Sequence, residues 1–176
     1  MDNLEIERRF LIFKYGEDYK KYPVSKIIQG YFEISGNSHK RVRIVDSKKA
    51  FLTEKIGSGI SRQEIEQPIK IKEGREILSG CRYIIKKNRY FCKDGWTVDF
   101  FLGKLSRIVI AEKELTTTKE KISLPKWIYS YDEVTDLFSS LDLAMIYPNL
   151  HLPDKPIEPI ELVRKILNEK AVGNLS

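Results

Sequence analysis

Pairs of carboxylates separated by a single residue occur twice, as Glu5 with Glu7 and as Glu112 with Glu114. In an extended strand alternate side chains point to the same face, so each pair aims four oxygens in one direction. Carboxylate oxygens are the ligands that hard divalent cations such as Mg²⁺ and Mn²⁺ prefer. The spacing therefore predicts a metal site. Further carboxylates at the same period, and further candidate metal ligands, are Glu64, Glu66 and Asp99.

Cationic side chains follow the same period of two. Guanidinium and ammonium groups bind phosphate oxygens, and the guanidinium group does so through two parallel hydrogen bonds. A polyphosphate bound to a divalent cation would satisfy the anionic and cationic sets together. We therefore predict a metal-bound triphosphate as the ligand. The candidate phosphate-binding residues are Arg9, Arg41, Arg43, Lys55, Arg62, Lys87 and Arg89.

The segments that carry these charges alternate between polar and apolar residues and are separated by turn sequences, such as Ser-Gly-Asn at 35–37 and Lys-Asp-Gly at 93–95. Short turns join antiparallel strands. We expect a mainly β (α+β) protein, a closed eight-stranded antiparallel β-barrel with peripheral and C-terminal helices. The expected strands are residues 4–13, 26–34, 39–46, 49–56, 60–69, 81–91, 95–101 and 107–116.

The alternative is an open sheet whose polar face lies in bulk water. Against it stands the composition of that face, which holds fourteen full charges of both signs and hardly any Ser, Asn or Gln. Burying such charges in a dry interior would cost several kcal/mol for each ion. We therefore expect a hydrated, electrically balanced channel inside the barrel.

Three segments carry helix signals. Residues 73–79 precede Gly80, a residue type common at helix C-termini. Residues 131–145 open with Tyr-Asp-Glu, and residues 159–170 place apolar side chains at helical spacing after a proline-rich stretch. We expect two parts, a domain over residues 1–150 and a proline-rich linker with a C-terminal helical tail over residues 151–176.

Composition narrows the classes of function. The 176 residues, 41% of them hydrophobic, correspond to about one domain with a sizeable core, and the net charge of +6 favours an anionic partner. Two cysteines and two histidines give neither zinc-site spacing nor a disulfide framework. Without a long apolar run we expect a cytoplasmic protein with no membrane partner. The surface lysines are scattered, which argues against a nucleic-acid partner. Whether the protein forms a homodimer stays open.

The ordered series of motifs resembles the CYTH proteins, the triphosphate tunnel metalloenzymes. Glu5-Ile-Glu7-Arg-Arg9 is similar to the Glu-x-Glu-x-Lys/Arg signature of that family, with Arg where Lys is common. The resemblance covers about residues 1–147. The series continues in family order through Gln29-Gly-Tyr31, Arg41-Val-Arg43, Lys55, Ser61-Arg-Gln-Glu-Ile-Glu66, Lys87-Asn-Arg89-Tyr90, Asp99 and Glu112-Lys-Glu114.

The resemblance implies a divalent-metal-dependent hydrolase, using Mg²⁺ or Mn²⁺, that cleaves a phosphoanhydride bond of inorganic triphosphate or a nucleoside triphosphate. A metal-oriented water would attack in line. The acidic residues named above become metal ligands, the basic residues become the phosphate cradle, and Tyr31 is expected to orient Lys55. The implied catalytic residues are Glu5, Glu7, Lys87, Arg89 and Tyr31.

Two other functions stay open. A class IV-type adenylyl cyclase would use the same cradle to make cyclic AMP from ATP. A non-catalytic protein would bind a phosphorylated nucleotide as a sensor or a sequestering protein. One segment departs from the family pattern, because many relatives carry a basic cluster in the helix that closes one tunnel end, whereas residues 138–142 read Phe-Ser-Ser-Leu-Asp. His39 precedes Arg41 and could contact a base or ribose, but we expect it at the surface beside a turn.

Overall fold

The computed structural model describes residues 4–57, 60–147 and 159–173, which form nine strands, three helices and three short 3₁₀ turns. The strands are β1 (Leu4–Tyr15), β2 (Val24–Ser35), β3 (Ser38–Val45), β4 (Lys49–Ile56), β5 (Ser61–Ile69), β6 (Tyr83–Phe91), β7 (Trp96–Phe101), β8 (Val109–Glu114) and β9 (Ile128–Glu133). The helices are α1 (Ile71–Ser79), α2 (Ser140–Ile146) and α3 (Pro159–Gly173).

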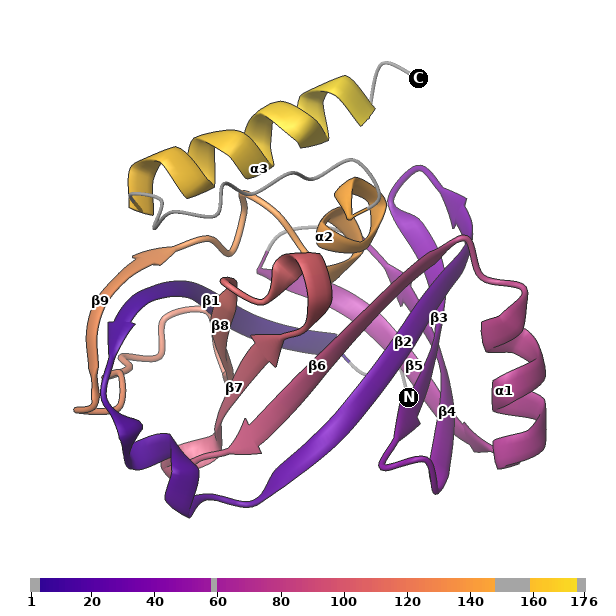
Figure 1. The fold of residues 1–176 in the computed structure, drawn as a ribbon, viewed down its shortest axis with the longest axis horizontal. Coiled ribbons are helices and arrows are strands. Elements are labelled where there is room, and N and C mark those ends of the chain that lie inside the picture. Colours follow the sequence, from indigo (N-terminus) through magenta and orange to yellow (C-terminus); the bar gives the residue numbers. More distant parts are fainter. Residues whose placement is uncertain (1–3, 58–59, 148–158, 174–176) are drawn as a thin grey trace.

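Eight of the strands close into an antiparallel barrel in the order β5-β4-β3-β2-β6-β7-β8-β1 (Figure 1). The closing contact joins β1 to β5, where Leu4, Glu5 and Ile6 face Gln63, Arg62 and Ser61. The ninth strand, β9, pairs with the C-terminal half of β1. The prediction of a closed eight-stranded barrel is confirmed, and the eight expected segments correspond to β1–β8 in chain order.

The segment between residues 131 and 145 was expected to be one helix, and that expectation is wrong. Residues 128–133 form β9, in which Tyr131 lies opposite Ile12 of β1, and α2 begins only at Ser140. The helix start lies at Ser139, whose hydroxyl accepts from the Asp142 amide while the Asp142 carboxylate accepts from the Ser139 amide. This reciprocal capping box, seven residues beyond Asp132, is the true N-terminal signal.

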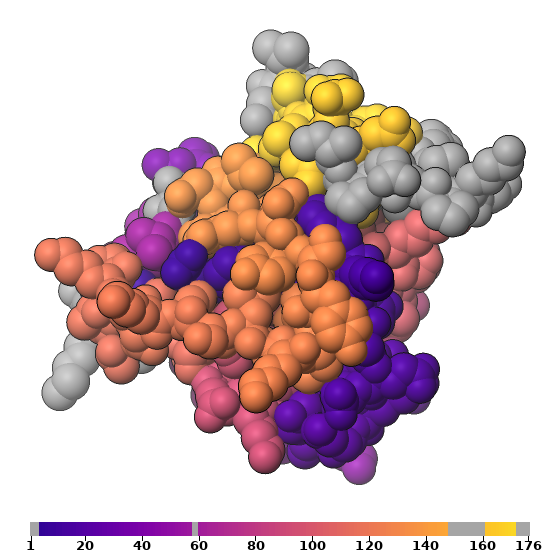
Figure 2. Space-filling view, turned by 90° about the vertical axis from the view of Figure 1, so that its left-hand side faces the viewer, coloured from indigo at the N-terminus to yellow at the C-terminus, as the bar shows by residue number. Residues whose placement is uncertain are grey.

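The helices cover the barrel on two sides. In Figure 1, α1 lies beside β3 and β4 at the right, while α3 crosses above α2 along the top of the molecule. Figure 2 looks onto the face built by the segment from β8 to α2, with α3 above it. Buried Leu162, Val163 and Ile166 of α3 share one hydrophobic cluster with residues of the barrel and of α2.

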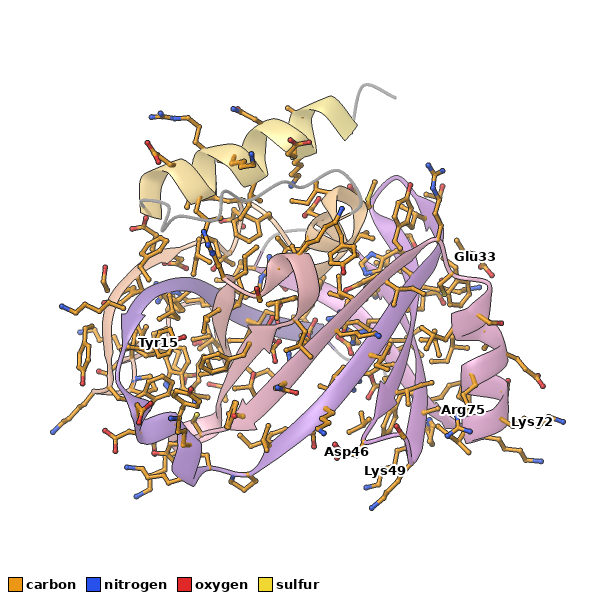
Figure 3. All side chains as sticks on the ribbon, viewed as in Figure 1. Tyr15, Glu33, Asp46, Lys49, Lys72 and Arg75 are labelled. Atoms are coloured by element: carbon orange, nitrogen blue, oxygen red, sulfur yellow. The ribbon has the colours of Figure 1, made fainter. Side chains whose placement is uncertain are left out.

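The expected boundary near residue 150 falls in 148–158, outside the described residues, so the division of the chain at this point stays a prediction. Among the described ranges, no helix combines the length and apolar character needed to cross a membrane. The cationic side chains labelled in Figure 3, Lys49, Lys72 and Arg75, extend from the outer surface near α1. The charges that the alternation pattern selected lie elsewhere, inside the barrel.

Candidate active site

A cavity of about 290 Å³ lies inside the barrel, and all eight barrel strands contribute side chains to its wall. Its charged lining comprises six carboxylates and seven cations. All of the predicted site residues except Asp99 line this one cavity. The lining residues are Glu5, Glu7, Arg9, Tyr31, His39, Arg41, Arg43, Lys55, Arg62, Glu64, Glu66, Lys87, Arg89, Gly95, Thr97, Glu112, Glu114, Ser139, Ser140 and Leu141.

Strand register explains why these side chains meet. Glu7 of β1 lies directly opposite Glu114 of β8, and Arg9 lies opposite Glu112. A one-residue slip in either strand would turn the whole set to the outer face. Like charges directly opposite one another destabilise a sheet, so the Glu7–Glu114 pair is suited to a ligand more than to stability.

Arg62 of β5 holds the first acidic pair. Its Nε donates to Glu5 Oε2 at 2.8 Å, and its Nη2 donates to Glu7. Burial lowers the pKa of Arg62, but the Glu7 and Glu5 carboxylates outweigh burial and raise it. Lys55 Nζ lies 2.7 Å from Glu5 Oε2 and 2.5 Å from Glu64 Oε2. In the described structure, cations of the chain itself therefore pair with Glu5, Glu7 and Glu64.

Glu114 differs from the other acidic residues of the wall. Burial and the neighbouring carboxylates of Glu5, Glu7 and Glu64 all raise its pKa. This excess of negative charge at one place is what a divalent cation would neutralise, and carboxylate oxygens suit Mg²⁺ or Mn²⁺ by their chemistry. Within the described residues, no three His, Cys, Asp or Glu side chains are yet grouped as metal ligands. The donor set fits the cation, but Arg62 would have to exchange partners.

Asp99 of β7 is fully buried and lies outside the cavity lining. Its carboxylate accepts from Lys87 Nζ at 2.5 Å and from Arg89 Nε at 2.7 Å. Arg89 Nη2 also reaches Glu112 Oε2 at 2.5 Å. Burial raises the pKa of Glu112, but the Arg89 and Lys87 charges outweigh it and lower the pKa to about 2. The contacts of Asp99 orient two predicted phosphate-binding cations, and its predicted metal-ligand role remains a prediction.

Arg41 and Arg43 of β3 pair with the carboxylates of β5. Arg43 Nη2 donates to both Glu66 oxygens at 2.7 Å, and Arg41 Nη2 lies 3.4 Å from Glu64 Oε1. Among the described residues, neither Arg41 Nε nor Arg43 Nε has a hydrogen-bond partner, although both atoms are buried. Buried donors without acceptors are costly, and phosphate oxygens are acceptors that could use them.

The sequence analysis assigned no role to three polar residues that support the site. Thr135 follows β9 and contacts Arg9 twice. Arg9 Nη2 donates to the Thr135 carbonyl oxygen at 2.7 Å, and the Arg9 backbone amide donates to the Thr135 hydroxyl. Thr53 Oγ1 donates to Glu66 at 2.8 Å, and Gln29 Nε2 donates to the Tyr31 hydroxyl at 2.5 Å. Thr53 and Gln29 lie two residues before Lys55 and Tyr31, so the period of two could have predicted that they face the cavity. Thr135 lies outside the predicted strands, and no such pattern applies to it.

His39 was expected at the surface, and that expectation is wrong because His39 lines the cavity. β3 begins at Ser38, so the inward-facing series that contains Arg41 and Arg43 also contains His39. Its ring centroid lies 5.6 Å from that of Tyr31. Burial, together with the Arg41, Lys55 and Arg62 charges, lowers the pKa of His39 to about 4.

The fold and the cavity define a tunnel-type β-barrel protein with a balanced ionic interior. No family model matches the sequence. The chain is 35% identical over 130 residues to the inorganic triphosphatase of Acetivibrio thermocellus, a match that covers 70% of this chain and 82% of that protein. With this similarity and the tunnel architecture, the chain belongs to the CYTH superfamily.

Solved structures agree with this assignment. The crystal structure of the inorganic triphosphatase NE1496 is similar with a TM-score of 0.56 and 25% identity, over 80% of this chain and 93% of that chain. A conserved hypothetical protein of Pyrococcus furiosus is similar with a TM-score of 0.50 and 22% identity, over 65% of this chain and 80% of that chain. The second similarity concerns the fold alone.

Proposed function

We propose that this chain is a divalent-metal-dependent triphosphatase that cleaves a phosphoanhydride bond inside the barrel. The observation that carries the proposal is the cavity inside the barrel, where all eight barrel strands contribute side chains and six of them contribute cations or carboxylates. The activity named for the Acetivibrio thermocellus relative, an inorganic triphosphatase, supports it. Catalysis of phosphoryl transfer depends mainly on positioning and charge neutralisation, and this cavity offers both.

The cationic residues would bind and orient the phosphate groups. Arg41, Arg43, Lys55, Lys87 and Arg89 already point into one space, and carboxylates hold each of them in place. A triphosphate would replace the β5 carboxylates as the partner of Arg41 and Arg43, while Lys55, Lys87 and Arg89 keep theirs. Because the cations are oriented before the substrate arrives, little reorganisation is needed when negative charge develops on the leaving group.

Glu5, Glu7 and Glu114 would hold Mg²⁺ or Mn²⁺ once Arg62 releases the first two. The bound cation would neutralise phosphate charge and lower the pKa of a water molecule that attacks the terminal phosphorus. Glu64 and Glu112 lie on the same wall, where they remain paired with Lys55 and Arg89 and keep these cations oriented.

The partner and the location of the protein follow as proposals. The substrate is a triphosphate, and no nucleic-acid or membrane partner is proposed. Two free cysteines, Cys81 and Cys92, suit a reducing compartment such as the cytoplasm. That the protein forms a homodimer remains a prediction, and a measurement of its molecular mass in solution would test it.

The test incubates the full-length protein with inorganic triphosphate and measures phosphate release with Mg²⁺, with Mn²⁺ and with a chelator. We expect turnover only with a divalent cation, and its loss in Glu114→Gln, which keeps the side-chain shape and removes one anionic ligand. The matched control is Glu76→Gln, on the exposed face of α1. Turnover in the chelator, or full activity of Glu114→Gln, would contradict the proposal.

Product analysis with ATP separates the alternatives that the sequence left open. A triphosphatase releases phosphate and ADP, or diphosphate and AMP, whereas a cyclase releases cyclic AMP and diphosphate. A binding protein would retain ATP and release neither. We expect phosphate without cyclic AMP.

A further inference from the structure

Arg9 is held differently from the other cations of the cavity. Each of the other six donates a hydrogen bond to at least one carboxylate. Among the described residues, the Arg9 guanidinium group donates instead to the backbone carbonyl oxygen of Thr135, which lies 2.7 Å from Nη2. A carbonyl oxygen carries no net charge, so this hydrogen bond orients the guanidinium group without neutralising it.

Two carboxylates lie near Arg9, and each is hydrogen-bonded to another cation. Glu112 lies directly opposite Arg9 in the β1–β8 pair, but it accepts from Arg89 Nη2 at 2.5 Å. Glu7 Oε1 lies 3.5 Å from Arg9 Nε, and Arg62 donates to the same oxygen. Within the described part of the chain, the buried Arg9 Nε has no hydrogen-bond partner. A phosphate oxygen could accept from Arg9 Nε without displacing a carboxylate from it.

Thr135 contacts Arg9 at both its backbone and its guanidinium group. The Arg9 backbone amide donates to the Thr135 hydroxyl at 3.1 Å, and the Arg9 carbonyl oxygen accepts from the Val134 amide at 2.8 Å. The Thr135 hydroxyl donates in turn to Glu133 Oε1 at 2.9 Å, and the same oxygen accepts from Arg8 Nε at 2.8 Å. Thr135 is only 5% exposed. Its hydroxyl is therefore fixed as donor and as acceptor, and it holds the end of β9 against β1 beside Arg9.

A side chain that is oriented before its ligand arrives loses less freedom on binding. Thr135 orients Arg9 in this way, through its hydroxyl at the backbone and through its carbonyl oxygen at the guanidinium group. We propose that Thr135 is a positioning residue, which directs Arg9 towards a phosphate group of the substrate and leaves the charge of Arg9 free for that group. This inference rests on the proposed function and adds to it a residue that lies outside the cavity lining.

A double-mutant cycle on ligand binding tests the proposal. Calorimetry on the full-length protein measures the dissociation constant of a methylene-bridged triphosphate analogue, which resists hydrolysis, in the presence of Mg²⁺. Thr135→Val keeps the side-chain shape and removes the hydroxyl, and we expect this constant to rise about tenfold, the scale of one hydrogen bond. In an Arg9→Gln background the same exchange should change it by less than about twofold, because Thr135 then has no guanidinium group to orient. Thr135→Ser keeps the hydroxyl and should bind the analogue within about twofold of the unaltered protein.

The matched control is Thr118→Val, at an exposed threonine in the loop after β8, and it should leave analogue binding unchanged. Glu133→Ala removes the acceptor of the Thr135 hydroxyl from an exposed position and serves as a second variant, so the test does not depend on the folding of Thr135→Val. We expect it to weaken binding about threefold, and only when Arg9 is present.

Unaltered analogue binding in both variants, or equal fold-changes with and without Arg9, would overturn the proposal and leave Thr135 a purely structural role. Protein that binds the analogue but does not hydrolyse inorganic triphosphate would refute the proposed function, and the cycle would still decide the role of Thr135. Absence of analogue binding in the unaltered protein would overturn both.

Discussion

Ion pairs within the cavity determine which residues can meet a ligand directly. Glu5, Glu7 and Glu114 line the wall, whereas Asp99 is fully buried and bonded to Lys87 and Arg89. A buried carboxylate between two cations keeps both in fixed positions, and neither cation can move without leaving charge uncompensated. We therefore expect Asp99 to act on a substrate through its two neighbours.

The exchange Asp99→Asn tests this role. The amide keeps the shape but leaves Lys87 and Arg89 without their buried counter-ion, so we expect a loss of about 3–5 kcal/mol in the free energy of unfolding. Urea denaturation measures the change. Asp132→Asn is the matched control, because Asp132 is exposed on β9, and we expect little effect there. Equal stability of the two variants would show that Asp99 does not hold the cations.

His39 gives a pH dependence whose sign can be worked out. Its pKa is about 4 in the folded protein, compared with an ordinary value of 6.5, because of burial and the Arg41, Lys55 and Arg62 charges. Between these values the unfolded chain binds more protons than the folded one, so the free energy of unfolding falls as pH drops from 6.5 towards 4. We expect His39→Gln to flatten that slope in denaturation measured from pH 4.5 to 7. Parallel slopes in the two proteins would refute this assignment.

Single residues of the site were predictable where the alternation of side chains along a strand alone decides whether they face the cavity. Glu7, Arg43 and Lys87 follow from period two, since every second side chain of a strand reaches the same face. His39 belonged to the same series, but its place beside a turn and its neutral side chain led to the wrong expectation. Thr135 could not be predicted, because its contact with Arg9 depends on how β9 runs along β1.

At the scale of elements, the strands were easier to predict than the segment after β8. Acidic residues at 132 and 133 are typical of a helix start. They lie in β9 instead, because pairing with β1 gives the backbone N–H and C=O groups of that segment hydrogen-bond partners. The signal that starts α2 depends on Ser139 and Asp142, which are polar residues beside an apolar stretch. Local propensity is here overridden by a partner strand distant in sequence.

Helix α3 is built into the core that covers α2, and Ile166 tests this packing. Its side chain is fully buried in the cluster that includes Val134 and Leu143. We expect Ile166→Ala to lower the free energy of unfolding by about 2–5 kcal/mol. Arg164→Ala, on the exposed face of the same helix, should change it by less than about 0.5 kcal/mol. Thermal or urea denaturation distinguishes them, and equal small effects would mean that α3 is a detached tail.

For the whole molecule, barrel closure turns a repeated charge pattern into one site. The net charge of +6 is spread over the chain, but the cavity itself is nearly balanced, with six carboxylates and seven cations on its wall. An anion that enters alone takes cations from their carboxylates, and a metal ion that enters alone takes carboxylates from their cations. Either step leaves buried charge without a partner, which is expensive in a confined interior.

We therefore expect a divalent cation and a triphosphate to stabilise the protein together by more than the sum of their separate effects. The measurement is a set of Tm values with Mg²⁺, with a methylene-bridged triphosphate analogue that resists hydrolysis, and with both, because a ligand that binds the folded state raises Tm by mass action. Mg²⁺ also binds the analogue in solution, so Glu114→Gln serves as the control. This variant leaves the solution complex unchanged and should lose most of the excess stabilisation, since one carboxylate that requires the metal is gone. Additive Tm shifts in the unaltered protein, or an equal excess in Glu114→Gln, would show that the two halves of the cavity bind their ligands independently.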